Sequence, residues 1–310
     1  MKFFEIRNIN QWAAEPRYFV TKGDRYYDDS IFRCAEKVLQ TADERPIVLL
    51  SGPSGSGKTT SALRIEALLN QWGHKTHTLS MDNYFYRRDD GWVPRDEEGK
   101  VDYESPYMMD IDLFQQHLRA IRDCKPVEVP SFDFINQRRR DTTTTLHRQP
   151  GEVVVVEGIH ALNPLVTGGA QDYSTGIYVS VRSRVKDDKG NILHPKYIRL
   201  LRRFLRDRVG RGQSLENTLE RLDSVERGEE KFIMPHKNNA EIHLDTFCLY
   251  ELCLYTVLLP ELRAMAPEHR NDPGIRAIID VLEQVTPISS ELVPHHALVR
   301  EFVGGGLAGH

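Results

Sequence analysis

Residues 52–59 limit what this chain can fold into more than any other part of the sequence. They read Gly-Pro-Ser-Gly-Ser-Gly-Lys-Thr, the pattern of a phosphate-binding loop. Glycines let the backbone wrap closely around phosphate oxygens, with several N–H groups pointing inward. In such a loop Lys58 reaches the β- and γ-phosphates, and the hydroxyl of Thr59 is a ligand of Mg²⁺.

The flanking sequence supplies the context that this motif requires. Residues 46–51 form a short apolar run typical of a buried strand, and residues 58–72 carry apolar side chains at helical spacing. A strand, a loop and a helix in this order place phosphates at a helix N-terminus. The sequence therefore predicts an ATP site that contains Gly52, Pro53, Ser54, Gly55, Ser56, Gly57, Lys58, Thr59 and Thr60.

Strand-like and helix-like segments alternate along most of the chain. Further strands are expected at 75–80, 127–131, 152–156, 176–181 and 240–244, and helices at 28–40, 110–122, 194–209, 215–227, 247–265 and 273–285. This alternation predicts an α/β fold with a mostly parallel sheet covered on both faces. Residues 1–24 show no clear period, and residues 138–149 favour a β-hairpin or a mobile loop.

The expected organisation has a single large domain. We expect an N-terminal extension and leading helix over residues 1–45, a P-loop domain over 46–245, C-terminal helices packed on that domain over 246–302, and a disordered tail over 303–310. The C-terminal helices either close the core or form a contact in a homo-oligomer, and the sequence leaves both open.

Composition argues against several partners. The net charge of −4 indicates no general affinity for nucleic acid or for an anionic membrane. No run approaches the roughly eighteen apolar residues of a membrane span. The four cysteines contain no CxxC pair, which fits a reducing compartment. Because the N-terminus also lacks a signal-peptide layout, we expect a cytoplasmic protein.

Two carboxylates are expected at the same sheet edge as the loop. Glu157 follows a strand of four valines, and Asp82 follows the strand at 75–80. Ligands of parallel sheets bind beyond the carboxyl ends of the strands. Glu157 is therefore placed to hold Mg²⁺ with Thr59, and Asp82 to accept a proton from a substrate hydroxyl. The alternatives are an ordinary strand-end charge for Glu157 and a turn or N-cap aspartate for Asp82.

Basic residues crowd one of the expected helices. At 3.6 residues per turn, Arg199, Arg202, Arg203 and Arg206 share one face, while leucine and phenylalanine side chains at other positions can anchor the helix. Phosphoryl transfer needs positive charge over the transferred group, commonly from a helix that closes as a lid. We expect such a lid over residues 194–213. The alternative is a solvated basic face paired with nearby acidic side chains.

An ordered set of segments within residues 46–245 resembles the uridine kinase and phosphoribulokinase family of P-loop kinases, and in particular the longer bacterial uridine-kinase-like proteins. The segments are residues 52–59, 81–85, 103–106, 129–134, 153–159, 199–212 and 232–235. The resemblance implies a P-loop NTPase fold of the nucleoside-monophosphate-kinase type, a three-layer sandwich with a mostly parallel sheet and a helical lid. It also implies ATP-dependent phosphorylation of a hydroxyl group, with ATP and Mg²⁺ as cofactors.

The resemblance also assigns roles to single positions. The catalytic positions are Asp82 as the base, Lys58, Arg203 and Arg206. Arg203, Arg206 and Arg211 fall on lid arginines, of which Arg206 and Arg211 join the loop in binding ATP, while Thr59 and Glu157 hold Mg²⁺. Glu104 falls where uridine kinases use an aspartate on the ribose hydroxyls. The positions expected to bind the acceptor are Asp82, Tyr84, Glu104, Phe132, Gln137, Arg203 and Gln213.

Three of these acceptor positions depart from the uridine kinase pattern. Phe132 replaces a tyrosine and can still stack on a ring. Gln137 replaces a histidine that contacts the pyrimidine, and its amide can both donate and accept. Gln213 stands where the family has an arginine. The phosphate-binding and metal-binding positions carry no such change, so the sequence indicates the donor half of the reaction more firmly than the acceptor half.

Three functions follow, in decreasing order of support. The first is a nucleoside kinase that makes UMP or CMP. The second is a kinase of a sugar, sugar phosphate or polyol, because Gln137 and the arginines at 138–140 suit a phosphorylated or hydroxyl-rich acceptor. The third is a nucleotide-binding regulator with little turnover, which the presence of Asp82, Thr59 and Glu157 disfavours. In the first two cases the partner is a small molecule.

Overall fold

A five-stranded parallel sheet lies at the centre of the molecule. The computed structural model describes residues 2–86, 93–133, 136 and 138–306. The strands of the sheet are β2 (Ile47–Ser51), β3 (Thr76–Ser80), β6 (Val153–Glu157), β7 (Ser174–Ser180) and β10 (Ile242–Asp245). Their order is β10-β7-β2-β6-β3, and every neighbouring pair is parallel. The predicted α/β fold with a parallel sheet is confirmed.

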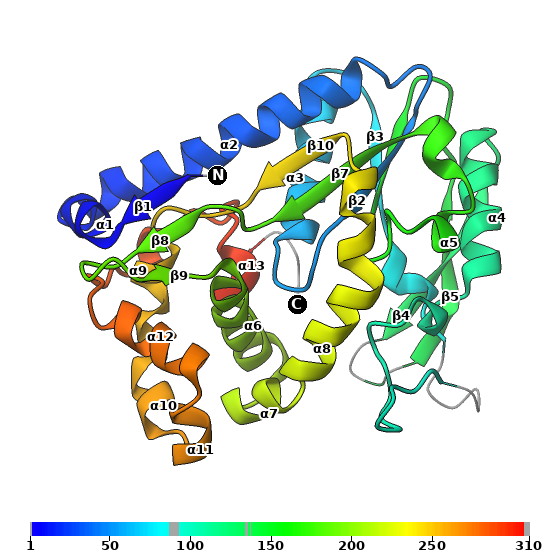
Figure 1. The fold of residues 1–310 in the computed structure, drawn as a ribbon. Coiled ribbons are helices and arrows are strands. Elements are labelled where there is room, and N and C mark those ends of the chain that lie inside the picture. Colours follow the sequence, from blue (N-terminus) through cyan, green and yellow to red (C-terminus); the bar gives the residue numbers. More distant parts are fainter. Residues whose placement is uncertain (1, 87–92, 134–135, 137, 307–310) are drawn as a thin grey trace.

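Helices cover both faces of this sheet (Figure 1). Side chains alternate along β2, because successive residues of a strand point to opposite faces. Val48 and Leu50 pack in one cluster with α2 (Pro16–Leu39) and α3 (Lys58–Gln71), whereas Ile47 and Leu49 pack in another with α4 (Ile111–Arg122) and α5 (Pro164–Thr167). The molecule is thus a three-layer sandwich, as predicted.

The strand order reverses direction at β2. β2 has β6 on one side and β7 on the other, so the chain must cross between the two sides after β6. Ligands of parallel sheets bind at such a reversal of strand order. The loop after β2, the 3₁₀ turn Met81–Tyr84 after β3 and the segment after β6 all leave the sheet at this edge.

A third apolar cluster joins parts of the chain that are distant in sequence. It gathers buried side chains of α1 (Ile6–Ala13), α6 (Pro195–Arg211), α9 (Glu251–Tyr255), α10 (Leu259–Ala264), α12 (Pro273–Leu282) and α13 (Arg300–Val303). Leu200, Leu201, Phe204 and Leu205 anchor α6 in this cluster and are at most 2% exposed. Figure 1 shows α13 beside α6, close to the loop that precedes α3.

Smaller elements complete the fold. β1 (Phe3–Glu5), β8 (Arg184–Lys186) and β9 (Ile192–Leu193) form a three-stranded sheet. β4 (Val127–Asp133) pairs with β5 (Arg138–Leu146) in antiparallel fashion, so the segment 138–149, predicted as a hairpin or a mobile loop, supplies one strand of a hairpin whose other strand is β4. The helices α7 (Leu215–Glu220), α8 (Leu222–Gly228) and α11 (Pro267–Arg270) are short.

The N-terminal region is the largest departure from the expected elements. Residues 1–24 show no clear period in the sequence, yet they form β1, α1 and the first part of α2, which begins at Pro16 and runs for 24 residues. The buried side of α2 packs on the C-terminal helices, with Phe19 edge-on to Tyr250 and Gly23 against the Tyr250 ring. Tyr250 lies more than 220 residues away in the sequence. The local pattern of apolar residues therefore indicated this part of the helix only weakly.

Two other predicted helices are interrupted. The helix expected over 215–227 is divided at Arg221 into α7 and α8. The helix expected over 247–265 becomes α9, a 3₁₀ turn and α10, which has Pro260 in its first turn, where the missing N–H of proline costs least. At the C-terminus α13 ends at Val303, and residues 307–310 lie outside the described residues.

Three of the four cysteines serve packing in this structure. All four are free, and Cys34, Cys248 and Cys253 are buried. Burial raises the pKa of the Cys34 thiol to about 12, so the reactive thiolate is scarce at neutral pH. Among the described helices, not one combines the length and apolar character that a membrane crossing requires.

Candidate active site

The loop between β2 and α3 has the conformation that its glycines allow. Gly55 and Gly57 have φ values of +74° and +83°, which side chains other than glycine rarely adopt. A Cβ atom on Gly52 would lie 2.1 Å from the carbonyl oxygen of Val179. The hydroxyl of Ser56 is buried and lacks a hydrogen-bond partner within the described residues. The loop is therefore a close-fitting cradle with unused polar capacity, as a phosphate site requires.

Two arginines of α6 hold this loop in place. Arg199 donates to the carbonyl of Ser54 at 3.0 Å and forms a two-pronged ion pair with Glu229 at 2.7 and 2.8 Å. Arg202 donates to the carbonyl of Gly55 at 3.1 Å and is fully buried. Both guanidinium groups are thus engaged by the protein, and they position the loop instead of forming a solvated basic face.

The next two arginines of α6, Arg203 and Arg206, differ in whether they have a hydrogen-bond donor available for a ligand. Arg203 is 6% exposed, lies against Gly55, and its buried Nε atom has no partner in the part of the chain that the structure describes. Arg206 donates to the neighbouring Asp207 at 3.0 and 3.1 Å. Arg203 therefore has a donor free for a ligand beside the loop, whereas Arg206 would have to exchange its partner. The side chain of Arg211 lies outside the described residues.

The predicted carboxylates meet Lys58 at the carboxyl edge of the sheet. Glu157 is 5% exposed and accepts a 2.8 Å hydrogen bond from the hydroxyl of Ser80. Burial and the charge of Asp82 raise the pKa of Glu157, while Lys58 opposes that shift. The Nζ atom of Lys58 contacts only the carbonyl of Pro53, at 3.3 Å, among its hydrogen bonds to described residues. The charged groups of Lys58, Asp82 and Glu157 therefore lie close enough to influence one another at this edge of the sheet.

Glu157 and Thr59 are a suitable donor set for Mg²⁺. Within the described residues no cluster of three or more His, Cys, Asp or Glu side chains could hold a metal by itself. Mg²⁺ in phosphoryl-transfer sites takes one or two carboxylates and completes its shell with substrate phosphates and water. A single buried carboxylate at Glu157, with Thr59 at the start of α3, fits that mode of binding.

Glu104 lies close enough to Lys58 and Arg203 for their charges to act on its carboxyl group. Its Oε2 atom is buried and has no hydrogen-bond partner among the described residues. Burial and the nearby Glu229 raise its pKa to about 7, while Arg203 and Lys58 act in the opposite direction. Gly228 packs directly on this side chain, since a Cβ there would come within 2.3 Å of the Glu104 Cβ. The carboxyl group is thus fixed in place with an unused oxygen close to Lys58.

His160 is a site residue that the sequence did not single out. It is 1% exposed, and neither ring nitrogen has a well-formed hydrogen bond within the described part of the chain. Burial lowers its pKa to about 3, although the backbone of Glu104 opposes the shift, so the imidazole is neutral and offers one donor and one acceptor. Its position three residues after Glu157, at the end of a buried strand, was the available signal.

The remaining predicted acceptor residues are scattered. Tyr84 is fully buried in the core, where its hydroxyl bonds Nδ1 of His117 at 2.8 Å, so it does not face the site. Phe132 lies edge-on to Phe85 beside the 3₁₀ turn that carries Asp82. Gln213 follows α6, and its N–H donates to the carbonyl of Asp207. Gln137 lies outside the described residues.

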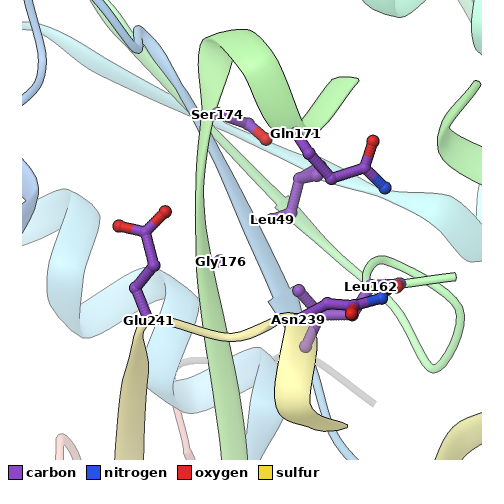
Figure 2. Close-up of a pocket in the computed structure, with 7 residues that line it drawn as sticks. All are labelled: Leu49, Leu162, Gln171, Ser174, Gly176, Asn239 and Glu241. Carbon is purple, nitrogen blue, oxygen red and sulfur yellow. Dashed lines mark hydrogen bonds between the residues drawn. The ribbon is translucent and has the colours of Figure 1, made fainter. Parts of the chain in front are cut away.

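A small hollow elsewhere in the molecule does not compete with this site. Figure 2 shows it beside the amino-terminal part of β7, lined by Ser174, Gly176, Glu241 and neighbouring side chains. Asn239 donates to the carbonyl of Leu162, and Gln171 donates to the hydroxyl of Thr167. Since these amide donors already have partners, the hollow is a packing gap.

The fold and the site together define a P-loop kinase, with a phosphate-binding loop, an arginine-bearing helix braced on it and carboxylates at two adjacent strand ends. A model of the phosphoribulokinase / uridine kinase family matches residues 47–249. The match covers well over half of the chain, which therefore belongs to this family. It follows that the protein is a small-molecule kinase, a phosphotransferase with a hydroxyl acceptor, and the family implies ATP as the donor.

Curated relatives and a solved structure agree with this assignment. The chain is 34% identical to a uridine kinase of Staphylococcus carnosus over 197 residues, which cover 63% of this chain and 85% of the relative. A uridine kinase of Staphylococcus aureus strain JH9 is 33% identical with the same coverage. A solved structure of a possible uridine kinase from Bacillus stearothermophilus aligns with a TM-score of 0.50 at 15% identity, covering 70% of this chain and 98% of that one, which bears on the fold alone.

Proposed function

We propose that this kinase transfers the γ-phosphate of ATP to the 5′-hydroxyl of uridine or cytidine. The observation that carries the proposal is the unused buried oxygen of Glu104, fixed near Lys58 and Arg203. Neighbouring ribose hydroxyls that donate hydrogen bonds to this oxygen would supply the partner that it lacks. Relatives named uridine kinase add support for a nucleoside over other hydroxyl acceptors.

In this proposal the site residues divide into those that bind ATP and Mg²⁺ and those that bind and activate the acceptor. The loop amides and Lys58 hold the phosphates, and Arg203 places positive charge beside them. Asp82 accepts the proton of the attacking hydroxyl, and Glu104 with His160 orients the sugar that carries it. Thr59 and Glu157 hold Mg²⁺, which when bound neutralises charge on the phosphates.

A sugar or polyol kinase is the second candidate. The lining of Glu104, His160 and Arg203 would suit any acceptor rich in hydroxyls. A phosphorylated sugar has less support, because one of the three arginines that could form a second anion site already has protein partners. Arg139 donates to Asp110 at 3.2 Å and to the carbonyl of Tyr84 at 2.9 Å.

The decisive test is a coupled ATP-to-ADP assay with purified protein and Mg²⁺. The acceptors would be uridine, cytidine, other nucleosides, pentose phosphates and polyols, with the Asp82→Asn variant as the blank. We expect turnover with uridine or cytidine. Turnover with a sugar or polyol, and none with any nucleoside, would replace the first proposal by the second.

His160 gives a prediction about acceptor binding. Replacing it by phenylalanine, which fills a similar volume, should raise KM for the acceptor about three- to tenfold, because one neutral hydrogen bond contributes on the order of 1 kcal/mol. KM for ATP should change little. Steady-state kinetics with each substrate varied in turn would measure both.

Two comparisons make this prediction specific. His160→Gln keeps a donor and an acceptor and should recover part of the acceptor affinity. His74→Phe changes an exposed histidine and should behave like the parent protein. An equal rise of both KM values in His160→Phe would instead indicate a general disturbance of the site, and an unchanged acceptor KM would remove His160 from the acceptor site.

A further inference from the structure

The C-terminal segment reaches into the phosphate-binding loop. Glu301, in α13, accepts two hydrogen bonds on its Oε2 atom, from the backbone N–H of Thr60 at 3.0 Å and from the Thr60 hydroxyl at 2.6 Å. Leu298 lies directly against Gly57, where a Cβ would come within 2.6 Å of it. A side chain from the last ten residues of the chain thus occupies the first turn of α3.

The N–H that Glu301 uses belongs to the phosphate site. The first N–H groups of a helix have no partner within the helix, and Gly57, at the N-cap, has no side chain to supply one. In a phosphate-binding loop these same groups hold the α- and β-phosphates. The two donors of Thr60 converge on one carboxylate oxygen, as they would on one phosphate oxygen.

The negative charge of Glu301 also affects the electrostatics of the candidate active site. Glu301 and Asp82 both contribute to the raised pKa of Glu157, after burial as the main cause. An anionic side chain at this place opposes phosphates in two ways: it takes their hydrogen-bond donors, and it repels their charge.

We propose that Glu301 is an autoinhibitory contact that holds the place of a nucleotide phosphate and must leave it before ATP binds. This inference rests on the proposed use of the loop for ATP. The departure needs only rotation of the side chain, because the backbone around it is anchored. Phe302 is fully buried and lies under the Arg202 guanidinium at 4.8 Å, and Val299 is fully buried as well.

The test is equilibrium binding of Mg²⁺-ADP, which requires no turnover and no acceptor. Removing the competing carboxylate in Glu301→Ala should lower Kd for ADP about three- to tenfold, and Glu301→Gln, which loses the charge but keeps an acceptor, should lower it less. Glu291→Gln removes one exposed charge from the same C-terminal segment and should leave Kd unchanged.

Thermal stability provides a second test, because the Glu301→Ala change should lower stability without nucleotide while it strengthens ADP binding. Without nucleotide, Glu301→Ala should melt at a slightly lower temperature than the parent, since Thr60 loses a cap. With saturating ADP its rise in Tm should be larger than that of the parent, because tighter binding stabilises the folded state more. A group with only a structural role would lower both stability and affinity.

The outcomes separate this inference from the proposed function. Unchanged or weaker ADP binding in both Glu301 variants, together with a clear loss of binding in Lys58→Ala, would overturn the inference and leave the phosphate-binding loop in use. Unchanged binding in Lys58→Ala would overturn the use of the loop and the inference with it. Tighter binding in Glu301→Ala, with a loss in Lys58→Ala, would support both.

Discussion

Replacing Asp82 by asparagine is expected to lower kcat by about 10²–10⁴-fold, the range usual for loss of a general base. The change keeps the size of the side chain and removes its ability to take a proton. Binding of ATP should stay nearly intact, because the loop and Lys58 supply the phosphate contacts. Single-turnover kinetics together with direct ATP binding would measure the two effects separately.

The Asp82 experiment needs a control for the lost charge. Asp112→Asn removes an exposed carboxylate from the first turn of α4 and should leave kcat unchanged. Full activity in Asp82→Asn would exclude Asp82 as the base. An equally large loss of ATP binding in that variant would indicate a role in the nucleotide site instead.

Replacing Glu251 by alanine is expected to lower the free energy of unfolding by about 3–5 kcal/mol. Glu251 and Arg202 are both fully buried, and the carboxylate bonds the guanidinium at 2.7 and 3.1 Å. The same arginine donates to the carbonyls of Gly55 and Thr246. Without its partner, Arg202 would remain as an uncompensated buried charge, which is the costly part of the change.

The matched control is an exposed ion pair on the same helix. Arg208 pairs with Glu261, and their side chains are 37% and 46% exposed. Glu261→Ala should cost less than about 1 kcal/mol, because water screens the pair. Urea unfolding of both variants would measure the difference. A Glu251→Ala variant as stable as Glu261→Ala would mean that Arg202 finds another partner and that the pair is not the brace described here.

Because Arg202 contacts the loop, the Glu251 variant should also alter function. Gly55 should lose part of its support, and Kd for ATP should rise along with the loss of stability. This link connects the C-terminal helices to the phosphate site, since Glu251 begins α9. No sequence signal indicated this link, because the two partners are 49 positions apart and Glu251 lies outside the segments that carry the resemblance.

Elements with a strong local signal were predicted accurately. The buried strands β2 and β6 and the helix α3 lie within a residue or two of their expected bounds, because unbroken apolar runs and helical spacing are properties of a few neighbouring residues. The start of α2 and the division at Arg221 were missed. The first part of α2 packs on Tyr250, and such a distant contact overrides local propensity.

In the candidate site, too, some residues could be placed from the sequence and others could not. Lys58, Asp82 and Glu157 could be placed together because the carboxyl ends of parallel strands share an edge. Tyr84, expected at the acceptor, instead turns into the core and bonds His117. Which side of a short turn faces the core depends on the elements that pack against it, and here α4 supplies the partner.

The sequence by itself determined the phosphate-binding loop, the parallel sheet and the family, because each is encoded in short motifs whose conformation follows from local chemistry. Only the tertiary structure decided which polar groups are already paired. Arg199 and Arg202 look like ligand-binding residues in the sequence but brace the loop, whereas His160 and Glu104 keep unpaired polar atoms. Partners such as these come from elements far apart in the chain, and burial sets what a missing partner costs.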